Sequence, residues 1–363
     1  MSSLPTPEFV VLGAGVIGLS TALTLSTTFP SSRITITATH FPGDRAAIYA
    51  SPWAGANWLS VATDGGAFES YDRVTFQRFD ELERSRPECG IKRMGIRAIF
   101  DNVIEEAGVL SVNEGGELGE RLWYEELVGG VRMLQPGEVP EGAKWGMEVE
   151  GTFVVNTQVY LPWLQNEALK KGIKFVRRSY SNIDDVSKDF PQAAAVFNCT
   201  GLGSYSLGGV EDHNLYPTRG QVVLVAEPKT PISKMYFRSP KRVDPSTTYV
   251  FPRPLGGGVI LGGCRQEGNW DGEVDLEFAE DIKKRCCALC PELGKPQELQ
   301  VISHGVGLRP SRKGNARIEG EQRGSVLIVH NYGASGAGYQ ASWGMAARGV
   351  DIAKQTLTPT SKL

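Results

Sequence analysis

A glycine-rich turn close to the start of the chain constrains the fold more than any other feature. The apolar run 9–12 predicts a buried strand, and it leads directly into Gly13-Ala14-Gly15-Val16-Ile17-Gly18, which matches G-x-G-x-x-G. A helical pattern follows and ends before Pro30, and residues 33–38 alternate like a second strand. In such a βαβ unit the glycines allow a tight turn and a close backbone approach, with the helix N-terminus facing phosphate. The segment therefore predicts a dinucleotide-binding site.

The sequence offers two candidates for the residue that binds the ribose hydroxyls of the dinucleotide. An acidic side chain is expected at the end of the second strand, but the sequence there reads Ala38-Thr39-His40, with Asp44 further on. Thr39 and Asp44 both stay open as candidates for this contact. We interpret His40 as a surface histidine.

Length, composition and charge describe an ordinary globular chain with one large domain or two interleaved ones. The 363 residues include 41% hydrophobic side chains and carry a formal net charge of −3, with basic residues scattered along the sequence. Neither a nucleic-acid partner nor a membrane surface is therefore predicted. The apolar stretch 9–25 is interrupted by glycines and preceded only by Glu8 as a charge, so it is typical of neither a secretory signal nor a membrane span.

The cysteines give no metal or disulfide pattern. Among the six, Cys287 and Cys290 have the C-x-x-C spacing that can mark a metal or redox site. No second pair or nearby histidine completes a zinc set, and Ile282, Cys286 and Leu289 recur at the spacing of a buried helical face. We therefore predict buried or half-buried thiols and no metal site.

The rest of the chain has α/β signals at both ends and an α+β segment between them. The Pro- and Gly-rich turns of the middle segment favour a mainly antiparallel sheet. The overall pattern predicts a nucleotide-binding domain built from separated pieces, with a second domain inserted. The expected strands are 151–155, 221–226, 248–252, 258–262 and 326–329, and the expected helices are 68–84, 161–171, 274–290 and 341–357.

Several further segments resemble the D-amino-acid oxidase family, which includes D-aspartate oxidases, and they follow one another in the family's order. They are similar, in turn, to the loop along the flavin, a second cofactor turn, the active-site strand, the substrate-carboxylate segment and the terminal flavin-binding turn. The segments are Ala50-Ser51-Pro52-Trp53-Ala54-Gly55-Ala56-Asn57-Trp58, Asn198-Cys199-Thr200-Gly201-Leu202-Gly203, Tyr249-Val250-Phe251-Pro252-Arg253-Pro254, Val306-Gly307-Leu308-Arg309-Pro310-Ser311-Arg312 and His330-Asn331-Tyr332-Gly333-Ala334-Ser335-Gly336-Ala337-Gly338-Tyr339-Gln340.

The resemblance implies FAD as the cofactor and an α/β fold, in which a Rossmann-like FAD-binding domain carries an inserted α+β substrate domain built on a mainly antiparallel sheet. It also implies oxidative deamination of D-amino acids by O2 to 2-oxo acids, ammonia and hydrogen peroxide, by direct hydride transfer to flavin N5. The expected FAD-binding domain is 1–60, 150–205 and 300–357, the substrate-binding domain is 61–149 and 206–299, and the C-terminal targeting tail is 358–363.

The resemblance also implies roles for single residues. Arg309 would clamp the substrate carboxylate, because a guanidinium grips a carboxylate in a fork, and Tyr249 would donate its hydroxyl to the same group. Gln340 is expected to lie near the substrate or an ordered water. The histidines are scattered along the sequence, and we interpret them as structural. Cofactor contacts are expected from Gly13, Ala14, Gly15, Val16, Ile17, Gly18, Ala50, Ser51, Ala54, Gly55, Asn57, Gly201, Arg309, Gly333, Ser335, Gly336, Gly338, Tyr339 and Gln340.

One departure from the family pattern bears on specificity. Where some yeast members carry a second active-site tyrosine after a glycine pair, this chain has Cys264-Arg265-Gln266. Arg265 in this setting resembles D-aspartate oxidases, where an arginine meets the side-chain carboxylate, and Arg238, on the segment matching the family's lid, is a second candidate for that role. Because the other motifs resemble fungal D-amino-acid oxidases, we favour a neutral or broad substrate range, with a D-aspartate oxidase preferring acidic D-amino acids as the alternative.

Two other classes stay open. An NAD-dependent dehydrogenase would share the first glycine motif without needing the glycine-rich turn 333–338, and a non-enzymatic FAD-binding or peroxisomal scaffold protein would share the cofactor alone. The sequence reads Ser361-Lys362-Leu363 at its end, the tripeptide read by the peroxisomal import receptor. We therefore expect that receptor as a partner and the peroxisome matrix as the location. The oligomeric state is left open, a homodimer included.

Overall fold

The chain forms two compact units in the computed structural model, which describes residues 6–113, 115–240 and 246–357. The boundaries expected from the sequence lay near residues 60, 150, 205 and 300. Unit 1 comprises Met1–Pro52, Leu161–Pro217 and Arg309–Leu363, and unit 2 comprises Trp53–Tyr160 and Thr218–Leu308.

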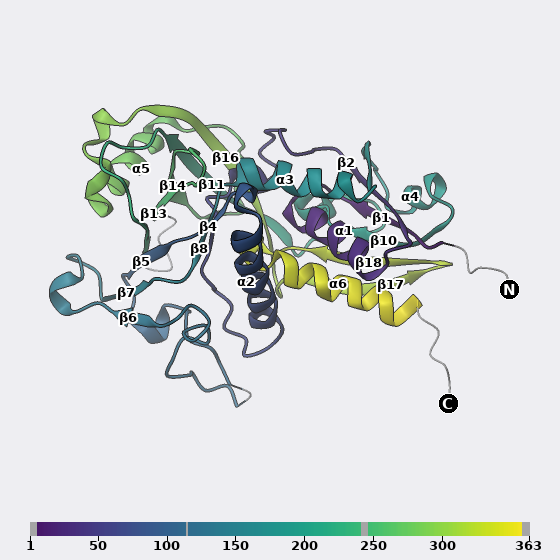
Figure 1. Cartoon of the computed structure of the whole chain (residues 1–363), viewed down its shortest axis with the longest axis horizontal. Helices are drawn as coiled ribbons and strands as arrows, with labels where there is room; N and C mark the ends of the chain where they lie inside the picture. The colour runs from purple at the N-terminus through teal and green to yellow at the C-terminus, as the bar shows by residue number, and fades with distance from the viewer. Residues whose placement is uncertain (1–5, 114, 241–245, 358–363) are drawn as a thin grey trace. The chain divides into compact units, whose positions relative to one another are not determined.

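Unit 1 is built on a six-stranded sheet with the order β17-β18-β10-β1-β2-β9 (Figure 1). β17 is antiparallel to β18, and the remaining neighbours are parallel. The central β1 places Val10 between Thr35 of β2 and Val196 of β10. The strands are β1 Glu8–Leu12, β2 Arg33–Ala38, β9 Lys174–Arg177, β10 Ala193–Asn198, β17 Arg317–Arg323 and β18 Val326–Tyr332.

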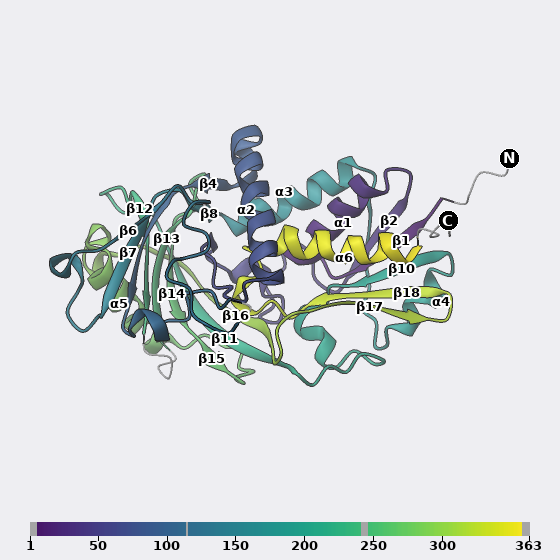
Figure 2. The same ribbon diagram turned by 90° about the horizontal axis from the view of Figure 1, so that it is seen from below.

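Both faces of this sheet are covered, which is why its central strands read as continuous apolar runs. On one face Val10 packs in a cluster with Val186 of α4 (Asp184–Asp189). Phe9 points to the other face, where its ring lies 4.9 Å from that of Phe29 at the end of α1 (Val16–Thr28). Helix α6 (Ser342–Leu357) runs beside α1, as Figures 1 and 2 both show. Among the described residues, no helix is both long and apolar enough to cross a membrane.

Unit 2 contains a nine-stranded sheet with the order β15-β11-β14-β13-β12-β5-β7-β6, in which β16 also pairs with β11. Along the ordered path β5 and β12 pair in parallel, and all other neighbours pair antiparallel. The strands are β5 Gly95–Phe100, β6 Val131–Met133, β7 Trp145–Val149, β11 Leu215–Val225, β12 Lys234–Ser239, β13 Ser246–Pro252, β14 Val259–Cys264, β15 Gln266–Glu267 and β16 Val301–Arg312.

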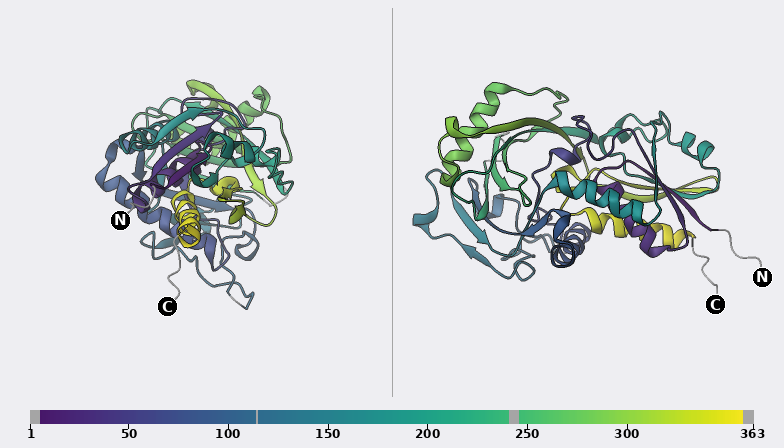
Figure 3. Two further views of the ribbon diagram at one scale, coloured as in Figure 1. Left: turned by 90° about the vertical axis from the view of Figure 1, so that its right-hand side faces the viewer. Right: turned by 45° about the horizontal axis from the view of Figure 1, so that its top comes forward.

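Helix α5 (Leu276–Leu289), green in Figure 3, covers one face of this sheet. Asp275 caps the helix, because its side chain accepts a hydrogen bond from the backbone N–H of Phe278 at 2.9 Å. Ile282 and Cys286 pack in one buried cluster with the sheet residues. Cys286 and Cys290 are therefore part of this core. All six cysteines of the chain are free. Burial raises the pKa of the Cys286 thiol to about 12.

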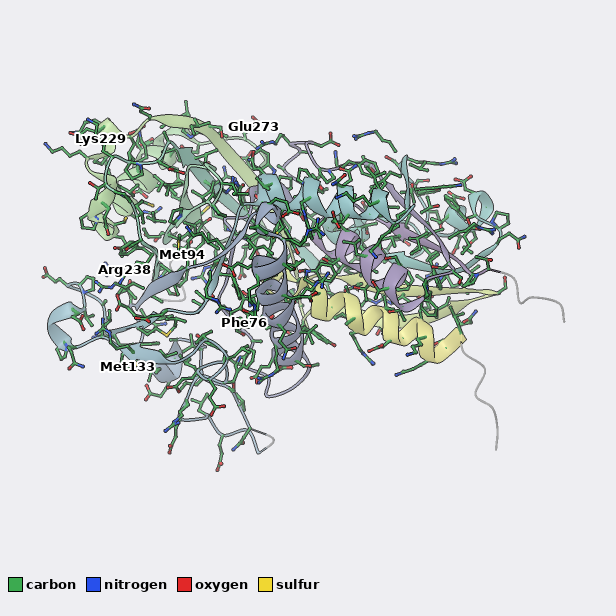
Figure 4. The ribbon with its side chains drawn as sticks, viewed as in Figure 1. Phe76, Met94, Met133, Lys229, Arg238 and Glu273 are labelled. Atoms are coloured by element: carbon green, nitrogen blue, oxygen red, sulfur yellow. The ribbon has the colours of Figure 1, made fainter. Side chains whose placement is uncertain are left out.

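A second, three-stranded sheet of unit 2 has the order β3-β8-β4 and packs against α2 (Ala67–Ser85) through aromatic rings. The ring of Phe76, labelled in Figure 4, lies 4.8 Å from that of Trp58 and 5.0 Å from that of Phe153. The remaining elements are β3 Asn57–Trp58, β4 Ile91–Arg93, β8 Phe153–Val155 and α3 Thr157–Lys170. The predicted fold class, an α/β unit with an inserted α+β unit on a mainly antiparallel sheet, is confirmed.

Candidate active-site residues

The turn between β1 and α1 leaves little room for a side chain at its three glycines. Gly13 has φ +103°, and a Cβ there would lie 2.5 Å from the carbonyl oxygen of Cys199. A Cβ on Gly18 would overlap the carbonyl oxygen of Gly13, and one on Gly15 would lie 2.9 Å from Oγ of Ser51. Packing therefore requires glycine at all three positions that the motif marks.

Helix α1 begins directly behind this turn, with Gly15 as its N-cap and no acidic residue in the first turn. The N–H of Val16 donates to Oγ of Ser51 at 3.1 Å, and the hydroxyl of Tyr49 donates to the carbonyl of Ala14 at 2.7 Å. Burial raises the pKa of Tyr49 above its usual range, so this donor keeps its proton. A helix start of this kind, with its N–H groups and its dipole, favours an anion such as pyrophosphate.

Ser51 also joins this turn to the second glycine-rich segment. Its carbonyl accepts a hydrogen bond from the hydroxyl of Tyr339 at 2.9 Å. Gln340, the next residue, is buried. The structure thus brings together three of the predicted cofactor residues, Val16, Ser51 and Tyr339.

The glycine-rich turn that follows β18 lies close to the β16 segment around Arg309, the residue predicted to bind the substrate carboxylate. Ser335 has φ +51°, and its hydroxyl lies 2.8 Å from that of Ser311. A Cβ built on Gly336 would lie 3.9 Å from Cδ of Arg309. The side chain of Arg309 therefore lies beside this turn.

An ion pair also anchors the β16 segment that carries Arg309. Nε of Arg312 donates to Oδ2 of Asp212 at 2.7 Å, and the hydroxyl of Tyr332 donates to the same oxygen at 3.0 Å. Burial alone would raise the pKa of Asp212, but these two donors outweigh it and hold the pKa below its usual value. Asp212 therefore stays ionised, and the segment is anchored at Ser311 and Arg312, directly after Arg309.

A hydrogen-bond network supports the second cofactor turn, at the end of β10. Oδ1 of Asn198 accepts from the hydroxyl of Thr200 at 2.8 Å, and its Nδ2 donates to Oγ of Ser204 at 3.0 Å. The same Nδ2 lies 3.3 Å from Nδ1 of the buried His330. The network holds Gly201, at φ +58°, at the start of a short 3-10 helix. The sequence marked this segment without showing how Thr200 and Ser204 stabilise it.

In unit 2, the ring of Tyr249 on β13 lies flat over the glycine pair of β14. A Cβ on Gly262 would overlap this ring, and one on Gly263 would lie 2.9 Å from its hydroxyl oxygen. The ring stacks on that of Phe251, with centroids 4.9 Å apart and planes at 20°. The Phe251 ring in turn occupies the space that a Cβ on Gly55 would need. A predicted substrate residue and a predicted flavin-loop residue are therefore connected through Phe251, which the sequence did not single out.

The two candidate specificity arginines lie at neighbouring positions of unit 2. Nε of Arg238, labelled in Figure 4, donates to Asp101 at 3.0 Å. Arg265 is exposed, and its Nη2 donates to the hydroxyl of Ser239 at 3.3 Å. Arg238 is therefore partly neutralised by a carboxylate.

The two candidates for the ribose contact have partners within unit 1. The hydroxyl of Thr39 lies 2.8 Å from that of Ser179. Asp44 accepts hydrogen bonds from Arg177 at 2.6 Å and from the N–H of Phe41 at 2.9 Å. The bond from Arg177 is the main reason why the pKa of Asp44 lies below its usual value.

Comparison with known proteins shows which family the chain belongs to. Residues 8–351 match the family model described as FAD dependent oxidoreductase, and a D-amino-acid oxidase of Schizosaccharomyces pombe is 41% identical over 352 residues, covering 95% of this chain and 96% of the relative. The chain belongs to the D-amino-acid oxidase family. Another relative in this family, a D-amino-acid oxidase of Fusarium vanettenii, is 38% identical over 94% of this chain and 95% of its own length. A D-aspartate oxidase of Talaromyces thermophilus is 30% identical over 96% of each chain.

Solved structures show that the D-amino-acid oxidase fold is shared more widely. Glycine oxidase from Bacillus cereus superposes with a TM-score of 0.71 at 18% identity, covering 97% of this chain and 96% of the other. Iminodiacetate oxidase from Chelativorans sp. superposes with a TM-score of 0.72 at 17% identity, covering 98% of each. At these identities the likeness concerns the fold alone.

FAD is the cofactor of the D-amino-acid oxidase family, and the residues of unit 1 fit it. In the turn from Gly13 to Gly18, a Cβ on any of the three glycines would crowd neighbouring protein atoms, and the turn leads into a helix with no acidic residue in its first turn. This arrangement suits the pyrophosphate of a dinucleotide. Among the described residues there is no group of three His, Cys, Asp or Glu side chains placed to hold a metal ion.

Proposed function

We propose that the protein oxidises D-amino acids to imino acids, which hydrolyse to 2-oxo acids and ammonia, while O2 is reduced to hydrogen peroxide. When bound, FAD supplies the two-electron chemistry, accepting the Cα hydrogen as hydride at N5 and passing the electrons to O2. The observation that carries this proposal is the place of Arg309 beside the turn around Gly336, in a chain 41% identical to a D-amino-acid oxidase.

The chain's own residues then bind and orient the substrate. Arg309 binds the α-carboxylate in a fork, and Tyr249 donates its hydroxyl to a substrate carboxylate oxygen. Gln340 contacts the substrate or an ordered water. The N–H groups of residues 333–338 would stabilise negative charge on the bound cofactor. No side chain needs to act as a base, because orientation and electrostatics carry the protein's share of the reaction.

The test is a panel of D- and L-amino acids with peroxide as the readout, applied to the wild type and to Arg309→Ala. Losing a charge-assisted hydrogen-bonded clamp costs about 2–3 kcal/mol or more, so kcat/KM for a D-amino acid should fall by roughly 100-fold, with FAD still bound. Arg348→Lys, an exposed arginine of α6 in the same unit, is the control and should keep wild-type kinetics. A near-normal KM in Arg309→Ala would show that another residue binds the carboxylate.

The proposed substrate range is neutral or broad. The two D-amino-acid oxidase relatives are more similar to this chain than the D-aspartate oxidase, and Arg238 is already paired with Asp101. The alternative rests on Arg265, an exposed arginine whose Nη2 donates to Oγ of Ser239, the residue next to Arg238. If Arg265 binds an acidic side chain, Arg265→Ala should lower kcat/KM for D-aspartate and D-glutamate much more than for D-alanine. Equal losses for all three substrates would remove this role.

We further propose the peroxisome matrix as the location, with the import receptor binding Ser361-Lys362-Leu363. These residues lie outside the described part of the chain, so the proposal rests on the sequence and on peroxide as the expected product. Fluorescent fusions with and without the tripeptide should differ in peroxisomal import. A homodimer is proposed from the resemblance alone, and light scattering of the purified protein tests it.

A further inference from the structure

A buried guanidinium in unit 2 has no part in the chemistry proposed above. Arg253 lies directly after β13 and is only 4% exposed. Its Nε donates to the carbonyl of Gly55 at 2.8 Å, and its Nη2 donates to the carbonyl of Ala54 at 2.8 Å and to Oγ1 of Thr157 at 3.0 Å. Burying a charge is costly unless hydrogen bonds compensate it, so an arginine in this place calls for a reason beyond packing.

The geometry of these contacts uses the shape of the side chain. Two nitrogens of one planar fork bind two successive carbonyl groups, and the hydroxyl of Thr157 also donates to the carbonyl of Ala54 at 3.5 Å. A lysine ammonium is a single point of charge on a flexible stem, and it cannot reproduce a fork. The backbone of Gly257 packs closely against Arg253, since a Cβ on Gly257 would lie 2.7 Å from the Cβ of Arg253.

The same strand face carries the other side chains that reach this loop. Tyr249 and Phe251 alternate along β13, and Arg253 continues this alternation directly after the strand, so all three point to one face of the sheet. The Phe251 ring lies against the Cα of Gly55 and stacks on the ring of Tyr249. The position of Gly55 is therefore coupled to the position of the proposed substrate tyrosine.

The loop is anchored by backbone contacts as well. Ser51 accepts a hydrogen bond from the first N–H of α1, at the dinucleotide turn. Ala54 follows three residues later, and three residues of chain span at most about 11 Å. Ala56 exchanges two backbone hydrogen bonds with Val155, at 3.0 and 2.8 Å. Residues 54 and 55, between these anchors, are the ones whose carbonyls Arg253 binds.

We propose that Arg253 is a positioning residue that fixes the peptide groups of Ala54 and Gly55, and through them the surface that this loop presents to the flavin. The proposal deepens the proposed function and rests on it, since the flavin gives the loop its role. A peptide group is planar, so fixing a carbonyl on one side also fixes the direction of the N–H on the other. Arg253 thereby sets both FAD affinity and the rate at which bound substrate is oxidised.

The test compares Arg253→Met and Arg253→Lys with the control Arg219→Met in the purified holoprotein. Arg219 is 3% exposed in the same unit and also donates to backbone carbonyls, at 3.0 Å to Asp271 and at 2.6 Å to Glu273, but it does not contact the loop. The readouts are hydrogen exchange of the peptide covering residues 51–58, the dissociation constant of FAD, the visible spectrum of the bound flavin, and kcat and KM. Thr157→Val serves as a milder variant that should fold even if Arg253→Met does not.

We expect Arg253→Met to accelerate exchange in residues 51–58, to weaken FAD binding by about 10-fold or more, to shift the flavin spectrum and to lower kcat more than KM. Arg253→Lys should rescue these properties only in part, Thr157→Val should show a smaller effect of the same kind, and Arg219→Met should lose thermal stability alone. Faster exchange with unchanged FAD affinity and spectrum would overturn the proposal, as would full rescue by lysine or the same spectral change in Arg219→Met. A wild type that binds FAD but oxidises no D-amino acid would refute the proposed function instead, and the exchange, affinity and spectral readouts would still decide the role of Arg253.

Discussion

At the scale of single residues, the glycine pair of β14 decides how the proposed substrate tyrosine is placed. A Cβ on Gly262 would overlap the ring of Tyr249, so in Gly262→Ala either the ring or the strand must move. Overpacking of this kind costs about 1–3 kcal/mol. We predict a lower thermal midpoint and, because the hydroxyl of Tyr249 is displaced, a KM for D-alanine at least about 10-fold higher. Thermal unfolding of the holoprotein and steady-state kinetics measure the two effects.

The matched control for this substitution is Gly137→Ala in the same unit. Nothing lies within 4 Å of the Cβ it would add, and it is absent from the glycines with positive φ. Gly137→Ala should therefore leave both the thermal midpoint and the KM for D-alanine unchanged. A Gly262→Ala enzyme with wild-type KM would mean that Tyr249 does not bind substrate through the position seen here. The sequence could suggest Tyr249 only by resemblance, since a flat ring over a glycine pair depends on the register of two strands.

At the scale of elements, the pairing of β17 with β18 buries a histidine under the cofactor turns. His330 is fully buried, with Nε2 3.1 Å from Oε2 of Glu321. Burial, followed by the charge of Arg317, lowers its pKa below the usual value, and the charges of Glu321 and Glu319 oppose this shift. Because the unfolded chain binds the proton more readily than the native one, stability is full above about pH 6.5 and falls as the pH drops below it.

We therefore predict that this histidine lowers the free energy of unfolding by up to about 1.4 kcal/mol between pH 6.5 and 5.5, the value of one pKa unit. In His330→Gln the difference between thermal midpoints at pH 7.5 and 5.5 should shrink. His213→Gln, which changes an exposed histidine of the same unit, should keep the wild-type difference. An unchanged pH dependence in His330→Gln would assign the acid sensitivity to other groups.

Elements with a strong local pattern were predicted closely, whereas two strands of the large sheet were missed. The helix expected at 68–84 is α2, Ala67–Ser85, and the one expected at 341–357 is α6, Ser342–Leu357. By contrast, β5 and β12 were not predicted. They pair in parallel in the middle of the sheet, and both carry a mixture of buried and half-buried side chains without strict alternation. Their strand character comes from their neighbours.

At the scale of the whole chain, the sequence indicated a discontinuous nucleotide-binding unit because α/β patterns lie at both ends. The structure places β18 beside β10 and β10 beside β1, so segments far apart in sequence form one parallel sheet. The ends of β1, β10 and β18 carry the three glycine-containing turns that the sequence predicted for the cofactor, at Gly13, Gly201 and Gly333. Motifs mark these turns individually, whereas only the strand order brings them to one edge.

This arrangement predicts that FAD stabilises the chain through its pyrophosphate as much as through its ring system. A ligand at 100 times its dissociation constant adds about 2.7 kcal/mol to the free energy of unfolding, so thermal midpoints of the FAD-free protein should rise with FAD concentration. Riboflavin has the same ring system without pyrophosphate and should raise the midpoint much less at the same concentration, while ADP should raise it in part. In Gly15→Val the added side chain would crowd Oγ of Ser51 and should remove the effects of FAD and ADP together. Equal shifts with FAD and riboflavin would mean that the turn between β1 and α1 contributes no binding energy, and the dinucleotide interpretation of unit 1 would then be wrong.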